Sequence, residues 1–283
     1  VKGAQEELRR ALPNWTDVEL DAYVSRHYPA YWLKVDLNRR IKHAHFIYGA
    51  EREMRTLATE VATDKFRGVT ELTVSAPDHP RLLAILTGAC AAAGANIVDA
   101  QIFTTTDGMA LDTIFISRAF DEDDDELRRA ARVARGIEQA LKGEIKIAEA
   151  VAAKAPPRGT AVKTFSVVPE IVVDNSLSNR FTVIEISGLD RPGLLYELTT
   201  AIGKRNLNIA SAHIVTFGEK AVDVFYVTDL TGGKVSHLTR QATIRRTLLD
   251  IFGAREAARQ PPRVGEEDLP RGRTKARHRA TKR

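Results

Sequence analysis

The sequence ELTVSAPDHPRLLAILTGACAAAGANIV at residues 71–98 occurs again, with changes, as VIEISGLDRPGLLYELTTAIGKRNLNIA at residues 183–210. A shift of 112 positions aligns the residues that shape each copy. The aligned residues are Asp78 with Asp190, Pro80 with Pro192, Leu82-Leu83 with Leu194-Leu195, and Asn96-Ile97 with Asn208-Ile209. After a one-residue gap near Gly108 the match resumes, with Asp112 on Asp223. A repeat of this length predicts a duplicated structural unit.

Both copies predict the same order of elements. Alternating apolar residues at 69–75 and 181–187 predict an opening strand, and helical spacing of apolar residues follows at 80–93 and from Pro192. Two more strands and a second helix complete each copy. The predicted ranges are strands 97–105 and 109–117 with helix 123–141, and strands 209–217 and 221–228 with helix 235–252. This order predicts an α+β, ferredoxin-like fold with an antiparallel sheet and both helices on one face.

The strand, the D-x-P-(G)-L-L loop and helix, and the following x-N-I strand resemble ACT domains, small ferredoxin-like modules that commonly bind amino acids. The tandem pair, VIEISGLDRPGLLYELTTAI followed by AVDVFYVTDLTGGKV, resembles the carboxy-terminal end of bifunctional PII uridylyltransferase/uridylyl-removing enzymes. Leu12-Pro13-Asn14-Trp15 and residues 28–33, YPAYWL, resemble the stretch just before that pair. The resemblance extends to about Phe252. It implies two tandem ferredoxin-like (βαββαβ) ACT domains preceded by a helical linker segment.

The expected domain boundaries follow from the repeat. Residues 1–66 are predicted to be helical and to join an upstream catalytic domain, because the chain begins at Val1 without an initiator Met. The first ACT domain is placed at 67–178, with an inserted linker at 143–164 and a late strand at 165–175 that completes its sheet. The second is placed at 179–254. No fourth strand follows it in sequence, so we expect it to borrow one or to end short.

The tail at residues 255–283 carries ten Lys and Arg against four Asp and Glu, whereas the rest of the chain is close to neutral. Its composition predicts disorder, and its charge permits contact with nucleic acid. We consider a nucleic-acid role unlikely, because the repeats show no basic stripe with interleaved aromatic residues. No signal peptide and no long apolar run is present, which predicts a cytoplasmic chain without membrane contact.

Three features could suggest other chemistry, and each has a simpler interpretation. Cys90 lies among alanines and is expected to be a packed core residue. His43 and His45 have no third ligand nearby, so we expect two surface histidines rather than a metal site. The acidic run at 121–126 lacks the spacing of a calcium loop and is expected to be a solvated helix start.

The candidate ligand site is the loop that enters the first helix of each repeat. Free N–H groups and the positive end of the helix dipole favour a carboxylate there. Asp190 could meet an ammonium group, Gly193 permits close approach, and Asn208 offers an amide; as a plain alternative, these residues form a helix cap and a turn. The predicted ligand residues are Asp190, Arg191, Pro192, Gly193, Leu194, Asn208 and Ile209, and in the first repeat Asp78, His79, Pro80, Asn96 and Ile97. The second loop is preferred because Arg81 stands where Gly193 does.

No catalytic residues and no metal ligands are found in the sequence, so we expect this chain to be inactive and to need no cofactor. The resemblance implies that both catalytic sites, with a divalent metal such as magnesium, lie upstream. It also implies that glutamine binding controls uridylylation and deuridylylation of the PII signal protein. The alternative is a ligand-free ACT module for assembly or dimerisation. A homo-oligomer through the ACT domains fits either interpretation.

Overall fold

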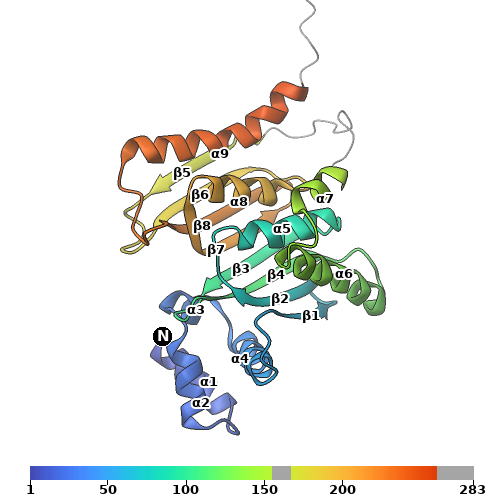
Figure 1. Cartoon of the computed structure of the whole chain (residues 1–283), viewed down its shortest axis with the longest axis vertical. Coiled ribbons are helices and arrows are strands. Elements are labelled where there is room, and N and C mark those ends of the chain that lie inside the picture. The colour runs from blue at the N-terminus through green and yellow to red at the C-terminus, as the bar shows by residue number, and fades with distance from the viewer. Residues whose placement is uncertain (155–166, 260–283) are drawn as a thin grey trace, which may run out of the picture.

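The structure is a computed structural model that describes residues 1–154 and 167–259, with the side chains of the last helix described to residue 253. Four helices lead into one large sheet that carries further helices (Figure 1). The elements in chain order are α1 Lys2–Ala11, α2 Asp17–Ser25, α3 Pro29–Lys34, α4 Leu37–Arg52, β1 Ala58–Asp64, β2 Val69–Pro77, α5 Leu82–Ala92, β3 Ile97–Thr104, β4 Met109–Ser117, α6 Asp123–Leu141, α7 Ile147–Lys154, β5 Glu170–Asp174, β6 Thr182–Leu189, α8 Leu194–Lys204, β7 Leu207–Phe217, β8 Lys220–Asp229 and α9 Leu238–Arg259.

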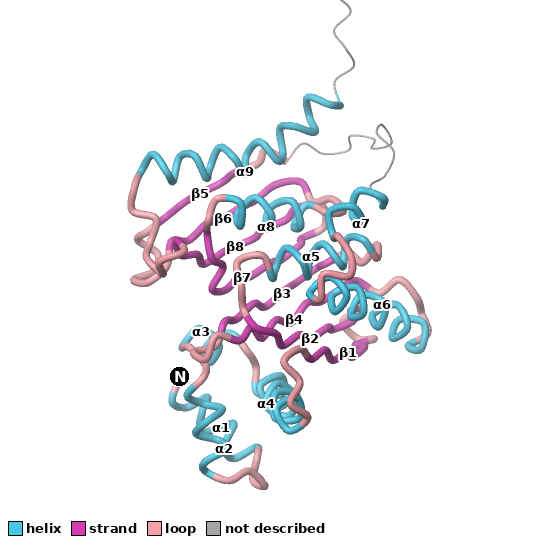
Figure 2. Tube along the Cα trace, viewed as in Figure 1, coloured by secondary structure: helices cyan, strands magenta, loops and turns pink. Residues whose placement is uncertain are grey.

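The strands form a single eight-stranded sheet in the order β1-β2-β4-β3-β7-β8-β6-β5 (Figure 2). All its neighbouring strands are antiparallel. The first four belong to the first repeat and the last four to the second. The two halves join where β3 pairs with β7, from Asp99 opposite Val215 to Phe103 opposite Ser211. Two ferredoxin-like units therefore share one sheet through equivalent strands, which confirms the predicted fold class.

The helices of both repeats lie on one face of this sheet (Figure 1). Strand residues of alternate positions, such as Ile114, Ile184 and Phe225, form one continuous core with Leu86 of α5 and Leu198 of α8. Alternation along each strand directs these side chains to the same face. Because α5 and α8 pack side by side at the centre, the entry loops of both repeats meet the neighbouring repeat.

The opposite face of the first repeat is covered by the segment α1–α4, through a second core that includes Phe103 and Leu111. His43 is only 1% exposed there, which corrects the expectation of a surface residue. Its Nε2 lies 3.0 Å from the Thr113 hydroxyl of β4, and its Nδ1 lies 3.2 Å from the Tyr31 hydroxyl. His45 is exposed as expected. The sequence did not show that α4 packs on the sheet, and this packing buries His43.

The prediction of the fourth strands was wrong. The late strand, β5, pairs with β6 and so completes the sheet of the second repeat rather than the first. The first repeat is completed by β1, which pairs with β2 and lies in the range predicted to be helical. Each unit therefore takes the strand that precedes it in sequence. Pro169 comes just before β5, which is an edge strand, a position where a proline is tolerated.

Two other boundaries differ from the predicted ones. Part of the expected linker is helical, since α7 spans Ile147–Lys154 and packs against α5. The last helix, α9, continues to Arg259, so the first residues of the predicted disordered tail are helical. The rest of the predicted linker and of the predicted tail, residues 155–164 and 260–283, lies outside the described residues.

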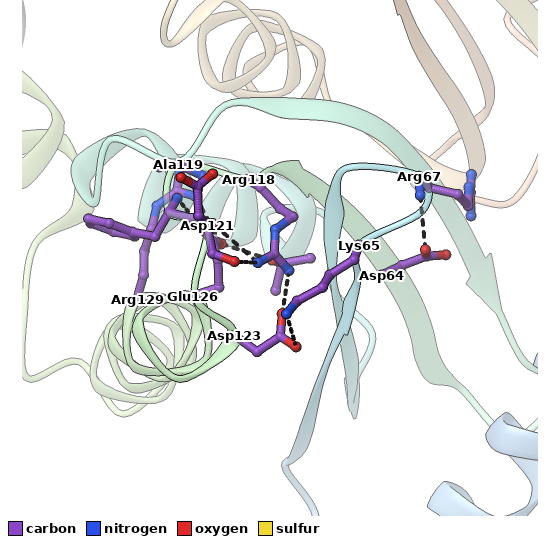
Figure 3. A network of polar contacts seen from close by, with 11 residues as sticks. Asp64, Lys65, Arg67, Arg118, Ala119, Asp121, Asp123, Glu126 and Arg129 are labelled. Atoms are coloured by element: carbon purple, nitrogen blue, oxygen red, sulfur yellow. Dashed lines mark hydrogen bonds and ion pairs between the residues drawn. The ribbon is translucent and has the colours of Figure 1, made fainter.

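The acidic run is only partly solvated. Asp123, in the first turn of α6, forms ion pairs with Arg118 and Lys65 (Figure 3). Glu126 is fully buried and accepts hydrogen bonds from the N–H groups of residues 119–120, the Thr70 hydroxyl and Arg129. Burial opposes its ionisation, but these donors outweigh it and lower the pKa of Glu126. The run thus anchors α6 to β2 rather than only facing water.

Two further observations bear on the sequence predictions. Cys90 is fully buried in the core, as expected, and burial raises the pKa of its thiol to about 12. Of the helices in the described ranges, none combines the length and the hydrophobicity that crossing a membrane requires.

Candidate functional site

The entry loop of the second repeat is fixed to its own hairpin. The Asp190 N–H donates to the carbonyl of Glu219 at 2.7 Å, and the Leu194 N–H donates to the carbonyl of Arg191. Gly193 is the N-cap of α8 and has a φ of 80°, a conformation that only glycine adopts readily. The Leu194 N–H is thus engaged, but no side chain caps α8, so the next N–H groups of its first turn, those of Leu195 and Tyr196, have no side-chain acceptor among the described residues.

The predicted cap by Asp190 is not formed; its carboxylate instead binds within the loop. One oxygen accepts from the Arg191 N–H at 2.8 Å, and the other lies 3.4 Å from the Thr216 hydroxyl of β7. Burial raises the pKa of Asp190, and these hydrogen bonds only partly offset it. The side chain is therefore a half-buried carboxyl held at the loop rather than a helix cap.

A second carboxyl lies close to Asp190. Asp223 of β8 is 2% exposed, and burial together with the nearby Asp190 raises its pKa to about 8. The first repeat holds the same pair, Asp78 with the 1% exposed Asp112, whose pKa is also raised by burial and by its neighbour. Asp78 accepts from Thr104, the equivalent of Thr216. This buried carboxyl pair is a feature of the duplicated unit that the sequence analysis aligned but did not interpret.

Arg191 supports the loop rather than facing a ligand. Its guanidinium forms two hydrogen bonds with the Glu197 carboxylate, at 2.8 and 2.6 Å, and a third with the carbonyl of Ile251. A bidentate pair of this kind restrains both side chains. Arg191 thus ties the loop to α8 and α9, and its donors are engaged within the protein.

The two repeats meet at α5 and α8. The hydroxyls of Thr87 and Thr199, which are equivalent residues, lie 3.1 Å apart. A contact between equivalent residues marks an approximate two-fold axis at that point. Gly88 lies next to Thr87 and leaves room for Tyr196 of the other helix, since an added Cβ would come within 2.8 Å of the Tyr196 ring.

This arrangement brings the entry loop of the second repeat next to the turn that follows α5 in the first repeat. A pocket of about 150 Å³ is lined by Asp190, Arg191, Pro192 and Gly193 on one side and by Asn96 and Ile97 on the other. Thr87, Ala91, Leu195 and Tyr196 contribute further walls from α5 and α8. The pocket far exceeds the roughly 10–15 Å³ that holds one water molecule. A half-buried carboxyl, an exposed amide at Asn96 and an uncapped helix start therefore converge on a space for a small polar molecule.

The remaining predicted residues lie elsewhere. Leu194 and Ile209 are core residues, 1% and 6% exposed. Asn208 is absent from the lining of this pocket, and its side-chain oxygen is buried without a partner among the described residues. Sequence reasoning paired Asn208 with Asp190 of its own repeat, whereas the structure pairs Asp190 with Asn96 of the other.

The loop of the first repeat borders a different pocket. Pro80 and Arg81 line a space of about 440 Å³ that also includes residues of α8. Asp78 and His79 are partly buried, and the His79 ring accepts from the Arg81 N–H at 3.3 Å. Burial raises the pKa of Asp78 and lowers that of His79. Thr87 and Tyr196 line the first pocket but were not predicted. The sequence of one repeat does not indicate which of its residues contact the other repeat.

Within residues 1–154 and 167–259, no cluster of three or more His, Cys, Asp or Glu side chains could hold a metal ion. We find no nucleophile paired with a base among the residues that line the pocket.

Comparison with known proteins gives the same domains. The ACT domain family matches residues 70–135 and 182–242. The chain is 56% identical over 262 residues to the bifunctional uridylyltransferase/uridylyl-removing enzyme of Rhodopseudomonas palustris, and 58% identical over 261 residues to that of a Bradyrhizobium species. These alignments cover 92% of this chain and 28% of each relative. Among solved structures, an aspartate kinase from Synechocystis matches at a TM-score of 0.36 and 15% identity, covering 66% of this chain and 27% of the kinase.

The chain spans about a quarter of the length of these relatives, and the match includes the helical segment as well as both repeats. The chain therefore contains two ACT domains in tandem and corresponds to one region of the bifunctional uridylyltransferase/uridylyl-removing enzymes.

Proposed function

We propose that the tandem ACT domains bind an amino acid, glutamine, and regulate a uridylyltransferase/uridylyl-removing enzyme of which this chain is a part. In this proposal, glutamine occupies the pocket between residues 190–193 and Asn96. Its presence biases the enzyme between uridylylation and deuridylylation of the PII protein. The catalytic sites and the magnesium ion that they would use belong to other parts of that enzyme, which would act in the cytoplasm.

The observation that supports this proposal is the convergence of complementary groups on one pocket. The uncapped start of α8 offers N–H groups to the ligand carboxylate. Asp190 is a lining residue of the same pocket, and its carboxyl would suit the ligand ammonium. The Asn96 amide can both donate to and accept from a side-chain amide. A zwitterion with an amide side chain would meet a partner at each polar group.

Location between two domains suits regulation. A ligand that contacts both repeats favours the arrangement in which they are apposed, and such differential binding is what shifts a conformational equilibrium. A coupling free energy of about 1–3 kcal/mol would be ordinary for this kind of control. The apolar core of the segment α1–α4 is shared with the first repeat, and Arg180 of the second repeat lies over the Tyr28 ring of the same segment. We propose that this segment carries the response toward the rest of the enzyme.

The test is calorimetric titration of the chain with the twenty amino acids, followed by thermal melting with those that bind. We expect L-glutamine to bind in a saturable manner and D-glutamine to bind much more weakly. At a hundred-fold excess over its dissociation constant, glutamine should add about 2.7 kcal/mol to the free energy of unfolding. Binding of no amino acid at all would contradict the proposal. The chain by itself should neither uridylylate nor deuridylylate PII, and activity of a clean preparation would contradict that part.

A second candidate function is assembly without a ligand. It is favoured by the β3–β7 junction, which shows that ACT sheets of this chain pair edge to edge. The outer strands β1 and β5 remain at the edges of the shared sheet. Sedimentation with and without glutamine separates the two functions: a concentration-dependent oligomer that ignores all amino acids would support assembly.

A further inference from the structure

The pocket beside the first loop differs in chemistry from the pocket beside the second. It has a volume of about 440 Å³ and lies between the start of α5, the connection from α6 to α7, and the end of α8. Its apolar walls include Ile85, Ile145 and Ile147. Since α7 has no counterpart after the second repeat within the described residues, this wall is not reproduced on the other side of the two-fold axis.

The charges at this pocket are positive. Arg81 and Lys204 line it from different repeats, and no carboxylate is found among its lining residues. Neither cation forms an ion pair within the part of the chain that the structure describes. In the first pocket, by contrast, Asp190 contributes a carboxyl and Arg191 is paired with Glu197.

The backbone at the start of α5 also favours an anion. Arg81 is the N-cap residue of α5, and no side chain caps that helix. The positive end of a helix dipole favours a negative group, and two cations without an ion pair in the described residues stand beside it at this pocket. Thr200 is a lining residue too, but its hydroxyl is itself buried and is not counted among the donors.

We propose that this second pocket binds a small organic anion, with its charged group between Arg81 and Lys204 and its carbon chain against the isoleucine wall. A zwitterionic amino acid suits it less well, because its ammonium would face two cations and no carboxylate. The chemistry that fits is a carboxylate or phosphate group on a short apolar body. The pocket is separate from the proposed glutamine site, so this assignment stands or falls independently.

One residue connects the two pockets. Tyr196 lines both of them, and its ring packs against α5 at Gly88. A ligand in either pocket therefore contacts the same side chain. We expect occupancy of one pocket to alter the affinity of the other, by the same factor in both directions.

The experiment is calorimetric titration of the chain with butyrate, with butyramide as an uncharged probe of similar shape and with inorganic phosphate as a second anion. Butyrate is expected to bind, butyramide is not, and the affinity for butyrate should fall as salt is added. Arg81→Gln and Lys204→Gln should each weaken butyrate binding by about ten-fold or more, the scale of a hydrogen bond to a charged group.

Matched controls make the result decisive. Arg246→Gln removes the same charge from an exposed position of α9 outside the pocket and should leave binding unchanged. Arg81 and Lys204 are exposed, so unchanged melting of their variants shows that folding is intact. Phosphate binding that is lost in Arg81→Gln would support the anion site, and tighter binding of phosphate than of butyrate would identify phosphate as the preferred group. The proposal is overturned if neither anion binds, if butyramide binds as tightly as butyrate, or if Arg246→Gln weakens binding as much as Arg81→Gln.

Discussion

The two pockets between the ACT domains are built from equivalent elements, yet they have different walls and opposite charges. At one, Gly193 opens the loop and Asp190 supplies a carboxyl, and the space is small. At the other, Arg81 replaces the glycine and joins Lys204, and α7 adds an apolar wall around a larger space. Duplication therefore conserved the scaffold while substitution at a few loop positions and one added helix changed the chemistry. The same comparison shows that a ligand site of this chain belongs to a pair of repeats rather than to one of them.

The helix interface that both pockets share should respond most strongly to mutation. In Gly88→Ala the new Cβ would lie 2.2 Å from Ile147 and 2.8 Å from the Tyr196 ring, so both side chains must move. We expect the free energy of unfolding to fall by about 2–3 kcal/mol, as overpacked cores commonly show. Urea denaturation measures this.

The matched control is Gly136→Ala in α6, where the nearest atom to the new Cβ would be Ala89 at 3.9 Å. Helix propensity alone should make that variant more stable, by up to about 1 kcal/mol. If Gly88→Ala proves as stabilising as Gly136→Ala, the packing between the repeats is looser than described here.

The two equivalent asparagines test whether the loop of one repeat binds glutamine together with the turn after the first helix of the other repeat. Asn96→Ala removes an amide that lines the glutamine pocket, and should weaken glutamine binding by about 1–3 kcal/mol through loss of a ligand hydrogen bond. Asn208→Ala, the equivalent change in the other repeat, should affect it much less. Calorimetry measures both. A larger loss of affinity in Asn208→Ala than in Asn96→Ala would show that glutamine is bound by the loop and the following turn of one and the same repeat.

The buried carboxyl pairs predict that the stability of both repeats depends on pH in the same way. The pKa of Asp223 is about 8 in the folded chain, well above the usual value for an aspartate, so the folded state holds a proton that the unfolded state releases. The free energy of unfolding should therefore decrease as the pH rises from about 4 to 8. Asp223→Asn should reduce that slope and stabilise the chain at pH 7.5 by about 1–2 kcal/mol, measured by denaturation at several pH values. A slope equal to that of the unmodified chain would mean that Asp223 ionises normally.

The segment that covers the first repeat should show the opposite pH dependence of stability. The second repeat, which it leaves uncovered, should not show that dependence. Burial lowers the pKa of His27 and His43 to about 3, so the unfolded state binds protons more readily below pH 6.5. Stability of the segment α1–α4 should therefore fall as the pH drops from 6.5 toward 3. His27→Phe should keep the stacking on Tyr31 and recover about 1 kcal/mol at pH 5. Hydrogen exchange resolves the segment from the second repeat, and equal acid sensitivity in both would contradict this assignment.

Local sequence was sufficient for the repeated unit and its loops. The alternation at residues 181–187 and the helical spacing after Pro192 reflect the periods of strands and helices, which are set by backbone geometry within a few residues. The same reasoning placed Cys90 in the core and identified residues 190–193 as the preferred loop. The sequence also showed that the first helix of one repeat starts at Gly193 and that of the other at Arg81. This difference distinguishes the two pockets.

Tertiary structure decided which segments come together. Strand periodicity carries no information about the partner of a strand, so β5 was assigned to the wrong repeat and β1 was missed. The partner of Asp190 was likewise undetermined, because the junction of β3 with β7 and the contact of Thr87 with Thr199 join residues far apart in the chain. His43 was misplaced for the same reason: its burial comes from the packing of α4 on the sheet. These contacts depend on how complete helix and sheet surfaces pack against one another, and that packing is defined only in the folded chain.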